Sequence, residues 1–156
     1  MHKKNLTKEQ ALQKLRHYCR YQERCCSEVK NKLFELGVNK TEHDKMVTGL
    51  IEENYLNEER FALAFALGRF TMRKWGRRKI HYELKERKVS EEAIQKSLKQ
   101  IDEELYVRSL QRLAEEKYAS LRDEPYLVRK KKTIDYMAQK GFETDLVKVL
   151  VEKMVN

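Results

Sequence analysis

Apolar residues recur along this chain at the three- and four-residue spacings that place them on one face of a helix. Thr7 and Gln10 have the spacing of a capping box, which satisfies backbone N–H groups at a helix start. Asn57 and Ser90 stand where they can cap later helices. The pattern predicts helices at about 8–22, 27–36, 41–54, 58–74, 77–87, 90–101, 103–119, 126–140 and 143–154.

The predicted helices repeat in groups of three. Val29, Ile80 and Thr133 hold equivalent positions in the second helix of each group, so the period is 51 and then 53 residues. Three helices bury little surface alone, and tandem units are therefore expected to stack and share cores. A single nine-helix bundle is the alternative, which periodicity does not exclude. We predict an all-α fold of three tandem three-helix repeats in an elongated, curved helical array, with repeats at 1–56, 57–101 and 102–156.

Composition limits the alternatives. Five Gly and one Pro in 156 residues are too few for the frequent turns of a β-architecture. No run of roughly 18 uncharged apolar residues is present, so no membrane span is expected. The N-terminal residues are followed by no apolar segment of the kind found in signal peptides. These features predict a cytoplasmic protein.

Residues that could carry chemistry form no recognisable constellation. The three cysteines, Cys19, Cys25 and Cys26, fit neither a disulfide framework nor a zinc spacing. Cys19 is expected in the core, and the adjacent pair at a turn. The chain has no Gly-rich phosphate loop, no nucleophile elbow and no HExxH, and its four histidines have no ligand spacing. We therefore expect no catalytic residue, no metal, no cofactor and no enzymatic activity.

The positive charge of the chain is concentrated in the middle. Lys and Arg total 34 against 25 Asp and Glu, a formal net charge of +9. The predicted central repeat holds most of this excess, and the predicted third repeat is neutral. Such asymmetry favours an acidic partner, either nucleic acid or an acidic protein surface.

The strongest candidate site is the start of the predicted helix at 77–87. Arg77, Arg78 and Lys79 come first in it, although a helix N-terminus already carries roughly half a positive charge. An anion supplied by a partner would compensate this arrangement. The alternative is internal neutralisation by Glu83 and Glu86. The first interpretation predicts that Arg77→Glu with Arg78→Glu leaves folding nearly unchanged.

Neighbouring cations extend this candidate. Arg69, Arg73 and Lys74 lie on the approach to Gly76, so the cluster spans two helices and their corner. Lys88 adds a further cation at the end of the second helix. In the third repeat Lys130, Lys131 and Lys132 fall in the slots of Arg77 to Lys79, next to Arg129. That second run is either part of the site or a solvated surface.

Aromatic residues among these cations have two interpretations. Phe70, Trp75 and Tyr82 could stack on bases, but their helical spacing favours core packing. For the tyrosines of the third repeat we expect half-buried packing positions: Tyr106, Tyr118, Tyr126 and Tyr136.

The sequence resembles the bacterial regulatory protein RecX family. The run from Tyr55 to Ala62, followed by Arg69, the segment 76–80 and Leu84, is similar to the central signature of that family. The segment 27–30, with Leu33 and Gly37, resembles its first-repeat motif. The resemblance implies a modulator, mainly an inhibitor, of the RecA recombinase and its ATPase in DNA repair and the SOS response. Members dock in the groove of the RecA–DNA filament, and some bind DNA directly.

The resemblance also assigns residues by position. The implied framework positions are Tyr55, Leu56, Phe61, Ile80 and Leu84, with Arg60 as a structural ion-pairing residue. The cations expected to face the filament or DNA are Arg69, Arg73, Lys74, Arg77, Arg78, Lys79 and Lys88, with Arg129 to Lys132 as further candidates. At Lys88 the chain departs from the family, where a Gly usually stands, so the helix end there is open to a different cap.

Two functions remain open from the sequence. In the first, a monomer without membrane contact binds the RecA filament and, weakly and salt-sensitively, single- or double-stranded DNA. In the second, the chain is a stand-alone basic nucleic-acid-binding helical module. Binding to naked DNA collapses with rising salt, whereas docking on a protein filament retains apolar and shape-dependent affinity.

Overall fold

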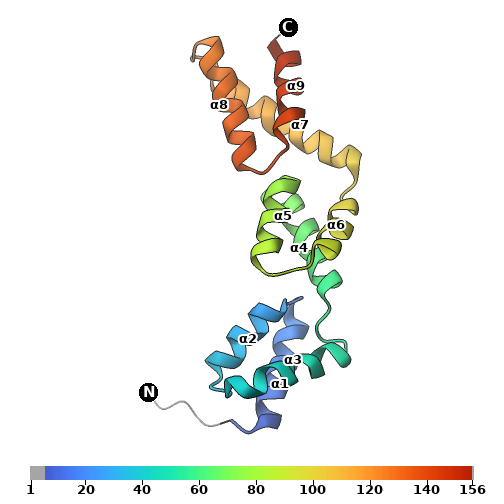
Figure 1. The fold of residues 1–156 in the computed structure, drawn as a ribbon. Helices are drawn as coiled ribbons and strands as arrows, with labels where there is room; N and C mark the ends of the chain where they lie inside the picture. The colour runs from blue at the N-terminus through green and yellow to red at the C-terminus, as the bar shows by residue number, and fades with distance from the viewer. Residues whose placement is uncertain (1–5, 156) are drawn as a thin grey trace.

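The fold is an elongated, all-α array of three-helix groups. The computed structural model describes residues 6–155, and among these residues there are nine α-helices and no strand. Figure 1 shows the three groups following one another from the N-terminal end to the C-terminal end. The helices are α1 (Lys8–Tyr21), α2 (Cys26–Glu35), α3 (His43–Glu52), α4 (Glu58–Arg73), α5 (Arg77–Glu86), α6 (Glu91–Lys99), α7 (Glu103–Ser120), α8 (Tyr126–Gln139) and α9 (Thr144–Val155), with one 3-10 turn at Lys40–Glu42.

Local capping explains most of the helix starts. The Thr7 hydroxyl accepts a hydrogen bond from the Gln10 N–H at 3.1 Å, and the Gln10 side-chain carbonyl accepts one from the Thr7 N–H. Asn57 and Ser90 cap α4 and α6 in the same way, as predicted. These bonds satisfy N–H groups that would otherwise lack a partner at a helix start.

Two predicted starts were misplaced. Helix α2 begins at Cys26 with Cys25 as its N-cap, one to two residues before the predicted cap at Ser27, because the Glu28 carboxylate accepts from the Cys25 N–H at 3.0 Å. Helix α3 begins at His43 rather than Thr41, because the segment before it first forms a 3-10 turn capped by Asn39.

The second helix of every group ends in the same way. Gly37, Lys88 and Gly141 adopt left-handed backbone conformations with φ of 76°, 61° and 94°. In each case the following N–H bonds the carbonyl five residues back, at 3.0 to 3.1 Å, which is the Schellman arrangement. Lys88 therefore keeps the cap that Gly forms in the other two repeats. A non-Gly residue there costs about 1 kcal/mol.

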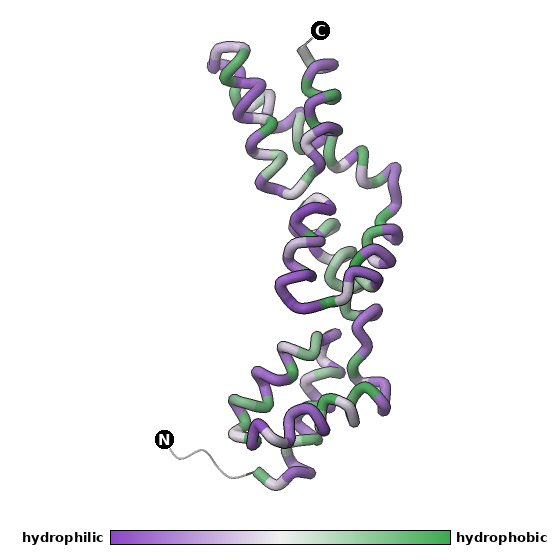
Figure 2. Tube along the Cα trace, viewed as in Figure 1, coloured by the Kyte–Doolittle hydropathy of each residue, from purple (hydrophilic) through white to green (hydrophobic). Residues whose placement is uncertain are grey.

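The hydrophobic core is divided unequally among the groups. The first group has a core of its own, formed by Ala11, Leu15, Val29, Leu33, Met46 and Leu50 among others. The second and third groups share one continuous core that includes Phe61, Ile80, Leu84, Tyr106, Phe142 and Val147. Apolar and hydrophilic positions are interleaved along the helices of all three groups in Figure 2. The shared core makes the last two groups a single packed block.

The cysteines are free thiols. Cys19 lies in the first core, as predicted, and its burial raises the pKa of the thiol to about 11. Cys25 is also buried but packs against the core of the second group, whereas Cys26 is exposed. No group of three or more His, Cys, Asp or Glu side chains in the described part of the chain could hold a metal ion.

Candidate functional site

The predicted basic site lies where α4 ends and α5 begins. Helix α4 stops at Lys74, whose backbone is left-handed with φ of 58° and whose N–H bonds the Arg69 carbonyl. Trp75 bonds the same carbonyl at 3.1 Å, and the buried Gly76 then caps α5 without a side chain. The chain thus turns sharply at a point where cations stand on both helices.

The N-terminus of α5 is capped by the third group of helices. Gly76 N–H donates to the Lys140 carbonyl at 2.7 Å, and Arg78 N–H donates to the Gly141 carbonyl at 2.9 Å. Arg77 N–H donates to the Tyr106 hydroxyl at 3.1 Å. The negative C-terminal end of α8 therefore faces the positive N-terminal end of α5. The chain therefore supplies acceptors for these N–H groups itself, which the expectation of an external anion did not include, while an anion for Arg78 and Lys79 stays a prediction.

Arg77 belongs to this internal arrangement. Its guanidinium donates to Glu143 at 2.8 Å, pairs with Glu103, and lies 3.8 Å from the centre of the Tyr106 ring. The Tyr106 hydroxyl donates to Glu143, and burial followed by this hydrogen bond raises the pKa of Tyr106. Arg77 is therefore held inside the joint between the second and third groups. Reversing its charge would disturb the fold, contrary to the prediction from sequence.

The internal carboxylates are also not the ones expected. Glu83 pairs with Arg87 at 2.9 Å, one turn further along α5, and no ion pair of Glu86 is found in the described part of the chain. Glu103 and Glu143, from the third group, neutralise Arg77 instead. This contact joins residues up to 66 positions apart.

Two glycines bring the backbones of the second and third groups into contact. A Cβ atom on Gly76 would lie 2.4 Å from the carbonyl carbon of Gly141. A Cβ on Gly141 would lie 2.3 Å from the Cβ of Lys79. Only hydrogen atoms fit in these positions, so both glycines are required for the joint.

Six cations remain around this joint without a carboxylate partner. Within residues 6–155 none of them has an acidic side chain within 4.0 Å. Arg73, Lys74 and Arg78 are exposed, while the other three are half-buried. We call this group the junction cluster: Arg69, Arg73, Lys74, Arg78, Lys79 and Lys140.

Lys140 was not predicted from the sequence. Its ammonium donates to the Arg73 carbonyl at 2.9 Å, at the C-terminal end of α4. Burial lowers the pKa of Lys140, and the charges of Lys79 and Lys74 lower it further. No local pattern marks this residue, because only the docking of α8 on the α4–α5 corner brings it there.

Arg69 shows the same crowding of positive charge. Burial lowers the pKa of its guanidinium first, and Arg73 and Arg87 lower it further. Its side chain lies over the rings of Phe65 and Trp75, with the guanidinium carbon 4.5 and 5.5 Å from their centres. Lys79 lies over the same Trp75 ring, with its Nζ 4.6 Å from the ring centre. Aromatic faces thus support part of the cluster without neutralising it.

The second predicted run of cations differs from the first. Lys131 pairs with Asp135 and Lys132 with Glu124, each at 2.7 Å, and Lys130 pairs with Glu152. Arg129 donates to the Tyr118 carbonyl at 2.7 Å and lies over its ring. These residues also lie one turn inside α8 rather than at its start. Lys130 to Lys132 therefore align with Arg77 to Lys79 in sequence, but the two runs of cations have different charge environments.

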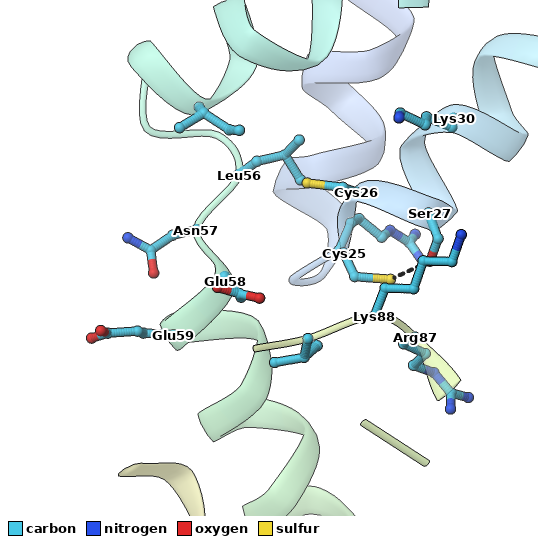
Figure 3. A pocket seen from close by; sticks show the side chains of 13 residues that line it. Cys25, Cys26, Ser27, Lys30, Leu56, Asn57, Glu58, Glu59, Arg87 and Lys88 are labelled. Atoms are coloured by element: carbon cyan, nitrogen blue, oxygen red, sulfur yellow. Dashed lines mark hydrogen bonds between the residues drawn. The ribbon is translucent and has the colours of Figure 1, made fainter. Parts of the chain in front are cut away.

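Lys88 lies away from the junction cluster, at a cleft between the first and second groups. The cleft has a volume of about 740 Å³ and is bounded by the start of α2, the first turn of α4 and the connection between α5 and α6. Figure 3 shows Cys26 and Lys30 on one side of it and Lys88 on another, with Glu58 and Glu59 at the start of α4. Charges of both signs line this cleft.

The framework positions have the environments expected of them. Leu56, Phe61, Ile80 and Leu84 are buried. Tyr55 is half-buried, and its hydroxyl accepts from Arg20 at 2.8 Å. Arg60 makes the expected kind of ion pair, with Glu23 at 3.0 Å.

The aromatic residues follow the packing prediction only in part. Phe70 is buried and Trp75 half-buried, but Tyr82 is 60% exposed one turn after Arg78. Among the tyrosines of the third group, Tyr106 is fully buried and Tyr126 is exposed, instead of half-buried. Tyr118 and Tyr136 are half-buried as predicted.

No helix in the described part of the chain is both long and apolar enough to cross a bilayer. The fold and the site together define an all-α tandem-repeat protein with a basic surface where its second and third units meet. A family model described as the second three-helix domain of RecX matches residues 57–98, and the third three-helix domain matches residues 103–150. Together they span more than half of the chain. The chain belongs to the RecX family.

Individual relatives agree with this assignment. The chain is 29% identical over 144 residues to a "Regulatory protein RecX" of Lactobacillus johnsonii, covering 92% of this chain and 53% of the relative. It is 30% identical over 132 residues to one of Clostridium botulinum, covering 83% of this chain and 61% of the relative. The chain thus spans about half the length of the first of these and somewhat more of the second.

Solved structures share the fold. The crystal structure of RecX from Lactobacillus salivarius superposes with a TM-score of 0.82 at 19% identity, covering 94% of this chain and 96% of the other. A second crystal structure of a regulatory protein RecX gives 0.83 at 19% identity, covering 97% and 81%. At this identity the likeness is one of fold.

Proposed function

We propose that this chain binds the RecA–DNA filament and regulates RecA, mainly by inhibiting its recombinase and ATPase activity. Membership of the RecX family and the name "Regulatory protein RecX" of its relatives support a regulatory role. The elongated array supports docking along an extended partner. The observation that carries the proposal is the junction cluster, because it is an accessible surface whose cations lack acidic partners in the described chain.

The charge environments support a smaller set of contact residues than the sequence indicated. Arg73, Lys74 and Arg78 are exposed and have no acidic neighbour within 4.0 Å among the described residues, so they are free to meet an anionic partner. Arg77 acts as a positioning residue, since its guanidinium is engaged by Glu143 and Glu103. Arg129 to Lys132 are weaker candidates, because each already has a partner in the chain.

The test is the DNA-dependent ATPase of RecA. Arg73→Glu with Arg78→Glu should abolish inhibition at equal protein concentration while leaving thermal melting nearly unchanged. Arg122→Glu with Lys148→Glu removes the same charge from two exposed cations of the third group and should inhibit normally. Undiminished inhibition by the first variant would remove the junction cluster from the contact surface.

A stand-alone nucleic-acid-binding module is the second candidate. Tyr82 favours it, because an exposed ring one turn from Arg78 could stack on a base. Binding to naked DNA that matches binding to RecA filaments in strength and in salt dependence would support this candidate over the first.

A further inference from the structure

More positive than negative charge gathers at the joint between the second and third groups. The C-terminal end of α8 and the N-terminal end of α5 face each other, so their partial charges of roughly −0.5 and +0.5 offset one another. The C-terminal end of α4 supplies about half a further negative charge, and Glu103 with Glu143 exceed the charge of Arg77 by one. Five cations gather around these ends: Arg73, Lys74, Arg78, Lys79 and Lys140.

The third group contributes a cation that completes this surface. The Lys140 carbonyl accepts from the Gly76 N–H, while the Lys140 ammonium turns back to the Arg73 carbonyl. Lys140 is thereby held beside Lys74 and Lys79, close enough for their charges to act on it. The three ammonium groups come from residues up to 66 positions apart and converge only when the two groups are docked.

The side-chain types indicate which anion fits. Carboxylates elsewhere in this chain are held by both arginine and lysine, as Arg77 holds Glu143 and Lys132 holds Glu124, whereas the lysines of the joint have no such partner among the described residues. The lysines of the joint are compact point charges with rotatable donors, which suit phosphate oxygens approaching from several directions. A polynucleotide strand presents one phosphate per nucleotide, so one strand can neutralise several of them.

We infer that Lys74 and Lys79 of the second group and Lys140 of the third form a composite phosphate site built across the joint, and that its ligand is the backbone of a DNA strand. This inference rests on the proposed function and deepens it, since it assigns the cluster to the DNA of the filament rather than to acidic residues of RecA. Arg73 and Arg78 flank the site. The Gly76–Gly141 contact and Arg77 hold its two halves together.

The test uses a fluorescent single-stranded oligonucleotide and the full chain at several salt concentrations. A plot of log affinity against log salt has a negative slope, to which each phosphate contact on a single strand contributes about −0.7. Lys74→Gln, Lys79→Gln and Lys140→Gln together should therefore lower the magnitude of this slope by about 2. Lys140→Gln alone should lower it by about 0.7. Lys130→Gln, Lys131→Gln and Lys132→Gln remove the same net charge from paired lysines and should leave the slope unchanged.

Binding of the same proteins to RecA–DNA filaments separates the inference from the function it rests on. A slope that does not change in the junction variant, with weaker filament binding, would overturn the phosphate site and keep the proposed function. A lower slope, with a wild-type chain that neither binds filaments nor inhibits RecA, would keep the site and overturn the function. An unchanged slope for Lys140→Gln alone would overturn the contribution of the third group.

Discussion

The two joints of this array are built differently. Between the first and second groups, one ion pair among the described residues, Arg60 to Glu23, spans a boundary that also contains the cleft of about 740 Å³. One carboxylate oxygen of Glu23 is buried there without a hydrogen-bond partner. Between the second and third groups, backbones touch at Gly76 and Gly141, and the fully buried Tyr106 lies against Phe70 and Phe142.

The comparison indicates which joint can support a binding surface. An open, charged joint lets one group move relative to the next, whereas a close-packed joint holds side chains of two groups in one geometry. The cations without carboxylates lie at the second joint, where Lys140 reaches the end of α4. We therefore expect the first group to move more freely than the packed block of the second and third groups.

The largest effect should come from a methyl group at the second joint. Gly76→Ala places a Cβ 2.4 Å from the Gly141 backbone and should lower the free energy of unfolding by about 3 kcal/mol or more. Gly68→Ala is the matched control in α4, because no atom lies within 4 Å of its added Cβ, and it should stabilise by about 0.5–1 kcal/mol. Denaturant unfolding measures both. Equal effects would show that the joint is not close-packed.

A smaller loss is expected from one hydroxyl group. Tyr106→Phe removes the acceptor of the Arg77 N–H and a donor to Glu143, and should cost about 1–3 kcal/mol. Tyr82→Phe removes an exposed hydroxyl and should leave stability unchanged. If both substitutions are neutral, the hydrogen bonds at the second joint do not hold the groups together.

Breaking the first joint should alter shape more than stability. Arg60→Ala removes a partly exposed ion pair with Glu23 and two hydrogen bonds to Asn54, and should cost about 1–2 kcal/mol, while solution X-ray scattering should report a wider range of molecular dimensions. Lys96→Ala breaks an ion pair with Glu59 inside the second group and should leave the scattering unchanged. A scattering curve of Arg60→Ala identical to wild type would mean that the first joint is held by other contacts.

The smallest effect is a difference between two equally buried thiols. Cys19 is 7% exposed within the first core and Cys25 is 6% exposed at the first joint. In a Cys26→Ser chain, raising salt should speed modification of Cys25 by about two- to fivefold, because it weakens the Arg60–Glu23 pair. Modification of Cys19 should respond less, because Cys19 lies inside the core of the first group and not at the joint. The same response at both thiols would indicate opening of the whole first group instead of the joint.

The sequence predicted the helices and their threefold repeat because both depend on local spacing. The capping bonds of Thr7, Asn57 and Ser90 join residues that are three positions apart. The bonds that close the left-handed helix ends at Gly37 and Gly141 lie within six consecutive residues. These features need no knowledge of which helices pack together.

The candidate site was only partly predictable because charge depends on tertiary neighbours. The unusual cations at the start of α5 were visible in the sequence, but their compensation comes from Glu103, Tyr106, Gly141 and Glu143 in the next group. Lys140 has no local signal at all. For the same reason the run at Lys130 to Lys132 looked equivalent in sequence although its charges are already paired.

The most direct test is co-sedimentation with RecA–DNA filaments of two variants that each lose three positive charges. We expect Lys74→Gln, Lys79→Gln and Lys140→Gln together to abolish co-sedimentation, and Lys130→Gln, Lys131→Gln and Lys132→Gln to leave it at the wild-type level. Equal loss in both variants would show that net charge, and not the junction cluster, governs binding. Retention by the first variant would contradict the account outright.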